Sequence, residues 1–107
     1  MAAALGLAAC GAQPKAITPE QSAILAPSDA RLSGLYATSC KTCHTIAGSG
    51  APLTGDARAW APRTKQGMAT LVAHTVQGFK AMPAGGQCAA CTAADYEALI
   101  AFMSKEP

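Results

Sequence analysis

Two cysteines and a histidine lie within five residues of the segment SCKTCHT, positions 39–45. Cys40 and Cys43 are three residues apart, so on a helical turn both thiols lie on one side of the chain, and His44 follows at once. Four kinds of chemistry use such a group: a structural metal site, a dithiol redox pair, a disulfide, or covalent attachment of haem. Each of them makes a different demand on the rest of the chain.

The first alternative is a structural zinc site, which wants four closed ligands, usually as two paired half-sites. The chain offers four thiolates for it: Cys40, Cys43, Cys88 and Cys91. A zinc site would account for neither His44 nor the methionine-containing loop before Cys88. The N-terminal leader, described below, also implies export into an oxidising compartment, which does not favour a site of four thiolates. A thioredoxin-like dithiol belongs at the end of a strand in a βαβ unit, and no strand pattern is visible. Both alternatives are less well supported than haem attachment.

Haem attachment accounts for the spacing of the motif directly. Two vinyl groups on one porphyrin edge can each accept a thiol only if both thiols come from the same side of the chain. The adjacent histidine then lies beneath the iron, and C-x-x-C-H is read as c-type haem attachment on these grounds. We therefore predict one haem c, bound covalently through Cys40 and Cys43, with His44 as an iron ligand.

Composition indicates one small domain with a thin core. The chain has 107 residues, of which Leu, Ile, Val and Phe together make up 16. Domains of this size often need a disulfide, a metal or another staple, because the buried fraction of a chain falls with its size. A large apolar cofactor would serve. The net charge of +2, without a basic tract, gives no support to nucleic-acid binding.

The periodicity of apolar residues predicts an all-α fold. A first helix, with Ser28 as its N-cap, leads to Cys40, and its apolar positions are Leu32, Leu35 and Tyr36. After a Gly/Pro loop over 46–56, a short helical turn is expected around 57–61. One face of a second helix over 68–79 carries Met68, Leu71, Val72, Thr75, Val76 and Phe79, with Gly78 as a stop.

The last helix begins after another loop, which holds Met82 and the second cysteine pair. Thr92 and Asp95 form a capping box at its start. Its apolar positions are Tyr96, Leu99, Ile100 and Met103. Neither an alternating strand pattern nor an internal repeat is visible in the sequence.

The N-terminal run Leu7-Ala8-Ala9-Cys10, followed by Gly11, resembles a bacterial lipobox, in which the cysteine sulfur carries diacylglycerol. We expect residues 1–9 to be part of a lipoprotein signal segment, 10–27 to be a lipidated cysteine and an extended tether, and 28–107 to be the domain. No Lys or Arg precedes the apolar run, so we expect the natural leader to be longer. The alternative is an Ala-rich leader with a chance cysteine; either leader implies export.

The second axial position of the iron separates an electron carrier from a catalyst or gas sensor. Candidates are Met68, Met82, Met103 and His74. Met68 and Met103 lie on apolar helix faces, where core packing explains them, and His74 lies off its apolar face. Met82 lies in a loop beside Pro83, outside any packing stripe. We predict Met82 as the sixth ligand, which favours ferrous iron and raises the potential.

Four stretches of the sequence resemble the small class I bacterial cytochromes of the cytochrome c5 type. They are GLYATSCKTCHTIAGSGAPLTGD, WAPRTKQGMATL, GFKAMPAGGQCAAC and the final amphipathic helix, and the match runs from about Ser28 to the C-terminus. The resemblance implies a cytochrome c fold of three to five helices wrapped around one covalent haem. Its most specific part is the pair Cys88 and Cys91, which in that family forms a disulfide.

The same resemblance implies further roles for residues at matching positions. Pro52 would offer its backbone carbonyl to Nδ1 of His44, and Trp60 and Arg63 would lie near the haem propionates. Gly34 would permit a close crossing of the first and last helices near Tyr96. A lipobox is not expected in the usual soluble form of the family, so membrane attachment would be a property of this chain.

Together these features predict a periplasmic, lipid-anchored, monomeric one-electron carrier rather than an enzyme. It would shuttle electrons between respiratory or redox proteins, and it would bind no nucleic acid. The alternatives are a haem-based gas sensor or peroxidase-type module with an exchangeable sixth ligand, and a thiol- or metal-handling lipoprotein using Cys88 and Cys91. Segment 40–80 carries five basic residues against Asp56 alone, which predicts partners with acidic docking surfaces.

Overall fold

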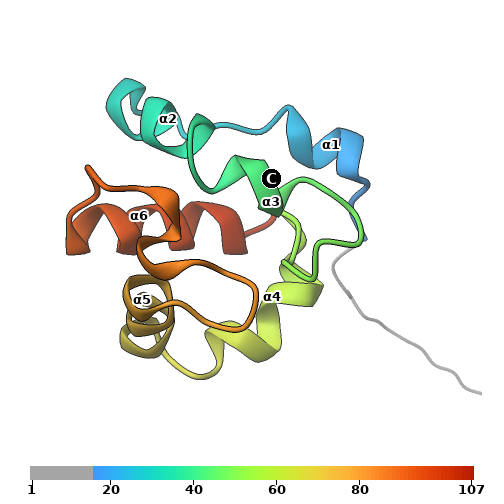
Figure 1. The fold of residues 1–107 in the computed structure, drawn as a ribbon. Coiled ribbons are helices and arrows are strands. Elements are labelled where there is room, and N and C mark those ends of the chain that lie inside the picture. Colours follow the sequence, from blue (N-terminus) through green and yellow to red (C-terminus); the bar gives the residue numbers. More distant parts are fainter. Residues whose placement is uncertain (1–15) are drawn as a thin grey trace, which may run out of the picture.

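The computed structural model describes residues 16–107, so Cys10 and the expected lipoprotein leader lie outside the described part of the chain. Within that range the chain forms six α-helices and one 3-10 helix (Figure 1): α1 (Pro19–Ala23), α2 (Ala30–Ala37), α3 (Lys41–His44), α4 (Ala57–Thr64), α5 (Met68–Gln77), η1 (Ala84–Gln87) and α6 (Ala93–Ser104). The described residues contain no strand, although Phe79 and Met82 pair in a single bridge. The prediction of an all-α fold is confirmed, although the described residues form six α-helices where three to five were expected.

Helix α6 lies at the centre of the fold, with α2 on one side and α4 and α5 on the other (Figure 1). The rings of Tyr36 from α2 and Phe102 from α6 meet edge to face at a centroid distance of 5.1 Å. Arg31 also joins these helices, because its guanidinium pairs with the buried carboxylate of Asp95 and holds the pKa of that group at about 2. The main buried cluster consists of Tyr36, Trp60, Leu71, Leu99, Ile100 and Met103.

One helix boundary differs from the prediction and another agrees with it. Helix α2 is capped by Asp29 rather than Ser28: the Asp29 carboxylate accepts a hydrogen bond of 2.9 Å from the backbone N–H of Leu32. Helix α5 ends at Gln77, and Gly78, with a φ of 89°, is the stop that the sequence predicts. Phe79 therefore lies beyond the helix, 43% exposed, and is not part of its apolar face.

Helix α4 is longer than the short turn expected around 57–61. The Asp56 side chain caps it by accepting from the N–H of Ala59, and the helix then runs past Pro62 to Thr64. Proline has no N–H to continue the helical ladder, which favours an early end. The helix nevertheless continues through Pro62 to Thr64, because a proline removes only its own N–H donor and restricts the residue before it, not those after it.

Helix α6 begins with the capping box that the sequence predicts. Thr92 accepts from the N–H of Asp95 at 3.1 Å, and the Asp95 carboxylate accepts from the N–H of Thr92 at 2.9 Å. At the other end, the Met103 carbonyl accepts a 2.8 Å hydrogen bond from the N–H of Gly55. That bond fixes the loop before α4 to the end of the central helix.

Helix α1 lies in the segment that was expected to be an extended tether. Thr18 and Gln21 form a capping box, and Pro19 stands at the first helical position. The chain here also packs on the domain, because a Cβ at Gly55 would lie 2.7 Å from the Leu25 side chain and 3.0 Å from that of Ile17. The expectation of a tether is therefore wrong for the described residues up to about 25.

Gly34 does not have the predicted role. It is exposed, and a Cβ built at this position would meet no atom within 4 Å. Helices α2 and α6 instead approach through larger groups, the Tyr36–Phe102 ring pair and the Arg31–Asp95 ion pair.

Candidate functional site

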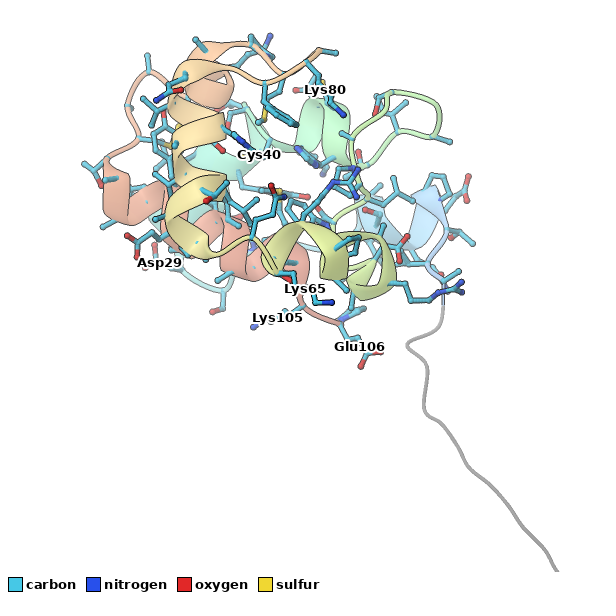
Figure 2. The ribbon with its side chains drawn as sticks, turned by 90° about the horizontal axis from the view of Figure 1, so that it is seen from below. Asp29, Cys40, Lys65, Lys80, Lys105 and Glu106 are labelled. Atoms are coloured by element: carbon cyan, nitrogen blue, oxygen red, sulfur yellow. A yellow bond between two sulfur atoms is a disulfide. The ribbon has the colours of Figure 1, made fainter. Side chains whose placement is uncertain are left out.

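The CKTCH motif is wound into a closed turn. The Cys40 carbonyl accepts from the N–H of Cys43 at 3.3 Å and from that of His44 at 3.0 Å. Both cysteines are free, Cys40 half-buried and Cys43 exposed. Seen from below, Cys40 lies near the middle of the view, with α5 on one side and α4 below it (Figure 2). The turn thus presents two free thiols and an imidazole within five consecutive positions.

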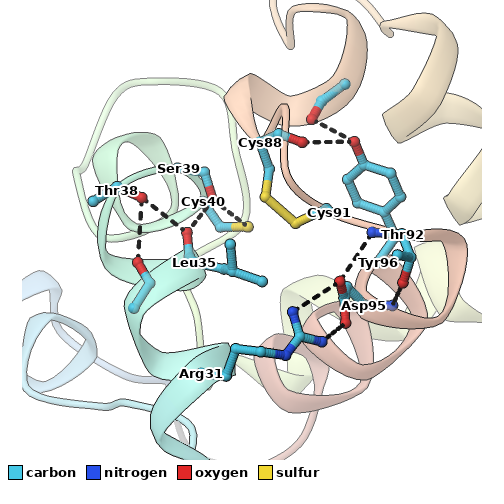
Figure 3. Close-up of a disulfide and its surroundings, with 12 residues drawn as sticks. Arg31, Leu35, Thr38, Ser39, Cys40, Cys88, Cys91, Thr92, Asp95 and Tyr96 are labelled. Carbon is cyan, nitrogen blue, oxygen red and sulfur yellow. Dashed lines mark hydrogen bonds and ion pairs between the residues drawn. A yellow bond between two sulfur atoms is a disulfide. The ribbon is translucent and has the colours of Figure 1, made fainter.

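The thiol of Cys40 has a specific environment at the end of α2. Burial raises the pKa of this thiol, and a hydrogen bond from the Ser39 hydroxyl at 3.5 Å acts in the opposite direction. Ser39 is itself buried and also donates to the Leu35 carbonyl at 2.6 Å (Figure 3). Helix α2 therefore positions the first cysteine through its last turn.

The His44 imidazole is held from two sides. Its Nδ1 lies 2.8 Å from the Pro52 carbonyl, the contact that the family resemblance implies, and its ring stacks on Trp60 at a centroid distance of 5.5 Å. In residues 16–107 the only hydrogen bond of the His44 ring is the one at Nδ1. Burial lowers the pKa of His44, the Arg63 charge lowers it further, and the Pro52 bond raises it. Burial thus favours the neutral form of the ring, and the Pro52 and Trp60 contacts orient it.

Trp60 and Arg63 lie beside this histidine on α4. Trp60 is 5% exposed, and its indole N–H donates to the Leu53 carbonyl at 3.0 Å. Arg63 is half-buried and donates to the Ala59 carbonyl at 2.6 Å. The indole therefore orients the His44 ring with its face, while its N–H secures the loop that holds Pro52.

A hydrogen-bond network that the sequence does not predict anchors the same loop. The N–H of Thr54 donates to the His44 carbonyl at 2.7 Å, and the hydroxyl of Tyr36 donates to the Thr54 hydroxyl at 2.9 Å. The buried hydroxyl of Ser22 donates to the Thr54 carbonyl at 2.8 Å. The capping-box pattern TPEQ at 18–21 could have revealed α1, and with it Ser22.

Met82 closes a tight reversal of the chain after α5. The backbones of Phe79 and Met82 exchange hydrogen bonds of 3.0 and 2.9 Å, and Lys80 between them takes a φ of 54°. The Phe79 ring stacks on the His74 ring with 3.9 Å between their centroids, so one face of that imidazole is covered. The Met82 side chain is half-buried. It projects from a loop whose shape is held by the backbone hydrogen bonds between Phe79 and Met82.

The second cysteine pair lies directly after η1. The Cys88 and Cys91 sulfurs are bonded, with 5.4 Å between their Cα atoms (Figure 3). The Tyr96 hydroxyl reaches the same place, with contacts of 2.9 Å to the Gly85 carbonyl and 3.2 Å to that of Cys88. Helix α6 thus fixes the segment between Met82 and the cysteine pair.

These positions leave the zinc alternative without its ligand set. In the part of the chain that the structure describes, no three side chains of His, Cys, Asp or Glu gather in a geometry that could hold a metal ion. Cys88 and Cys91 are bonded to each other, so they are not free thiolates that could join Cys40 and Cys43 in a metal site. In the same range, no helix is both long enough and apolar enough to cross a bilayer.

Comparison with known proteins places this geometry among relatives. Residues 27–103 match the family described as "Cytochrome C oxidase, cbb3-type, subunit III". The chain is 46% identical over 72 residues to "Cytochrome c-555" of Chlorobaculum tepidum. The aligned region covers 64% of this chain and 67% of the relative. It is 39% identical over 67 residues to "Cytochrome c5" of Azotobacter vinelandii, covering 61% and 81%.

A solved structure is similar over most of its length. "Crystal structure of electron transfer complex of nitrite reductase with cytochrome c" contains a chain that aligns with a TM-score of 0.61 at 37% identity. The alignment covers 71% of this chain and 93% of that one.

Proposed function

The chain belongs to the small monohaem class I c-type cytochromes, and from that premise we propose that it carries single electrons in the periplasm between larger redox proteins, with His44 and Met82 as its iron ligands. One haem c, bound covalently through the CxxCH cysteines, is the cofactor of this family. The haem iron supplies the one-electron chemistry. The side chains of this protein would hold the haem and cover it.

The donor set of this chain fits that cofactor. Cys40 and Cys43 are both free for thioether formation, burial favours the neutral form of His44, and its Nε2 makes no hydrogen bond within the described residues. The contact between Nδ1 and the Pro52 carbonyl is the observation that carries the proposal. A hydrogen bond at the far nitrogen fixes the tautomer and the orientation of a histidine that ligates metal through the other.

An optical spectrum tests this assignment. The protein, expressed with haem-maturation machinery, should give sharp low-spin bands when reduced and a far-red sulfur-to-iron band when oxidised. Intact mass after acid and acetone extraction should retain one haem, because thioether bonds survive unfolding. Complete loss of the haem on extraction would end the proposal.

We propose that the Cys88–Cys91 disulfide stiffens the Met82 loop. The disulfide closes a very short loop, so its loss should lower the free energy of unfolding by no more than about 2 kcal/mol. Thiol alkylation of the native oxidised protein should label neither cysteine. The double variant Cys88→Ser/Cys91→Ser should keep its haem and unfold at a moderately lower temperature; alkylation of both residues in the untreated protein would contradict the pairing.

The charge distribution supports partners with acidic surfaces. The basic residues of segment 40–80 are Lys41, Arg58, Arg63, Lys65 and Lys80, and the rest of the chain is net acidic. Lys41 lies between the two attachment cysteines, and Lys80 lies two residues before Met82. In the view from below, Lys80 is at the opposite edge from Lys105 (Figure 2). A positive surface beside the site would steer an acidic partner toward it.

Charge reversal near the site should therefore slow electron transfer. We expect Lys41→Glu and Lys80→Glu each to lower the second-order rate with the physiological partner roughly two- to tenfold at low salt. Added salt should lower the wild-type rate, because the screening length falls to roughly 8 Å at physiological ionic strength. Stopped-flow kinetics measures both effects.

Lys105→Glu is the matched control, since it reverses the same charge on the exposed chain end after α6. It should change the rate little, and all three variants should keep the wild-type spectrum and potential. Equal slowing by all three substitutions, or a rate that is indifferent to salt, would remove the case for a basic docking surface.

We further propose that Cys10 carries a lipid anchor, which the run Leu7-Ala8-Ala9-Cys10 supports. Each buried methylene of an acyl chain contributes about 0.8 kcal/mol, so more than one chain makes a stable anchor. Cys10→Ser in the full precursor should move the protein from the membrane fraction to the soluble periplasmic fraction. If the variant stays in the membrane pellet, the anchor is elsewhere.

A further inference from the structure

Helix α1 is not explained by the matched domain. It lies before residues 27–103, which match the family, yet it is a defined element with a capping box between Thr18 and Gln21. The segment is also packed, because Gly55 leaves no room for a Cβ beside Leu25. A helix added to the domain at this place is adjacent to the loop that holds His44.

Ser22 is the residue of α1 that reaches the site. Its side chain is 0% exposed, and a serine within a helix ordinarily faces water or bonds the carbonyl four residues back. Here the hydroxyl donates to the Thr54 carbonyl at 2.8 Å and lies 3.3 Å from the His44 carbonyl. A buried hydroxyl that has no partner is unfavourable, so these bonds specify where α1 docks.

The two carbonyls belong to the two ends of one loop. His44 begins it and Thr54 ends it, and the N–H of Thr54 closes it by donating to the His44 carbonyl at 2.7 Å. Pro52, whose carbonyl holds Nδ1 of His44, lies two residues before Thr54. A shift of Thr54 therefore moves the Pro52 carbonyl relative to the imidazole.

We infer that Ser22 is a positioning residue for His44: its hydroxyl fixes the loop that sets the Nδ1 contact with Pro52. This inference rests on the proposed ligation by His44. A well-formed hydrogen bond at Nδ1 raises the basicity of Nε2 as a ligand and so stabilises ferric iron. Loosening the loop weakens that bond and raises the midpoint potential. Helix α1 is then part of the tuning of the cofactor.

Ser22→Ala in the holoprotein tests this role. We expect a positive shift of the midpoint potential, together with a changed spread of the haem methyl resonances in the proton NMR spectrum of the oxidised protein. These resonances report the orientation of the axial ligands, which a purely structural role would not alter. The visible spectrum should keep its low-spin bands.

Leu25→Ala is the control, because it removes packing of the same segment on Gly55 and leaves the Ser22 hydroxyl in place. It should lower thermal stability while the potential and the methyl resonances stay at wild-type values. Should Ser22→Ala not yield folded holoprotein, Ser22→Cys keeps a weaker donor of similar size and should shift the potential in the same direction by less.

A wild-type potential in the foldable Ser22 variant would overturn the inference, as would equal shifts in Ser22→Ala and Leu25→Ala. The failure of the proposed ligation is distinguishable, because it appears in the wild-type protein itself as the absence of a low-spin His/Met spectrum.

Discussion

Met82→Ala should open the iron to exogenous ligands and lower the midpoint potential. The thioether favours ferrous iron, so its loss should lower the potential by on the order of 0.1 V or more, within the roughly 0.8 V range that axial ligands span. The reduced variant should bind carbon monoxide, which wild type should not. The far-red band of the oxidised protein should disappear. Optical titration with carbon monoxide and redox titration measure these changes.

Met68→Ala is the matched control. Met68 is half-buried and packs against the core cluster, so its truncation removes apolar contacts and leaves the Phe79–Met82 reversal intact. It should lower the free energy of unfolding by less than the roughly 2–5 kcal/mol of a fully buried methionine, with no new ligand binding. A far-red band that persists in Met82→Ala would show that another residue is the ligand. Carbon monoxide binding to the wild type would instead favour the gas-sensor or peroxidase-type alternative.

The residues that could be predicted from sequence are those whose spacing alone carries chemistry. CKTCH encodes its own geometry, because two thiols and an imidazole on one short turn need no distant contact to stand together. The capping box of α6 is similarly local: Thr92 and Asp95 are three residues apart, and both bonds form. The apolar period of α5 also predicts its body, and Gly78 predicts its end at Gln77, although Phe79, which continues the period, lies beyond the helix.

What could not be predicted depends on contacts between distant segments. Ser22 and Thr54 are 32 residues apart, and nothing in either local sequence shows that their backbones and hydroxyls meet. Trp60 illustrates the same limit, because an apolar residue near a site can pack in the core or face a ligand. In the structure Trp60 packs in the core cluster and also stacks on the His44 ring.

The core itself leads to the second large expected effect, that the chain without haem does not fold. Within residues 16–107 the buried hydrophobic residues number eight: Tyr36, Trp60, Leu71, Cys88, Tyr96, Leu99, Ile100 and Met103. A domain this small buries too little of its chain to offset conformational entropy without a staple. The disulfide closes too short a loop to supply the difference. The haem is then the main apolar element around which the helices pack.

The variant Cys40→Ser/Cys43→Ser, which cannot form thioethers, should therefore be largely unfolded at 25 °C. Far-ultraviolet circular dichroism should show most of the helical signal lost, and heating should give no cooperative transition. The disulfide variant Cys88→Ser/Cys91→Ser is the control, because it also replaces two cysteines but keeps the haem, and it should unfold cooperatively. A helical double variant at Cys40 and Cys43 with a sharp thermal transition would mean that α2, α4, α5 and α6 pack stably on their own. The haem would then contribute function without being required for the fold.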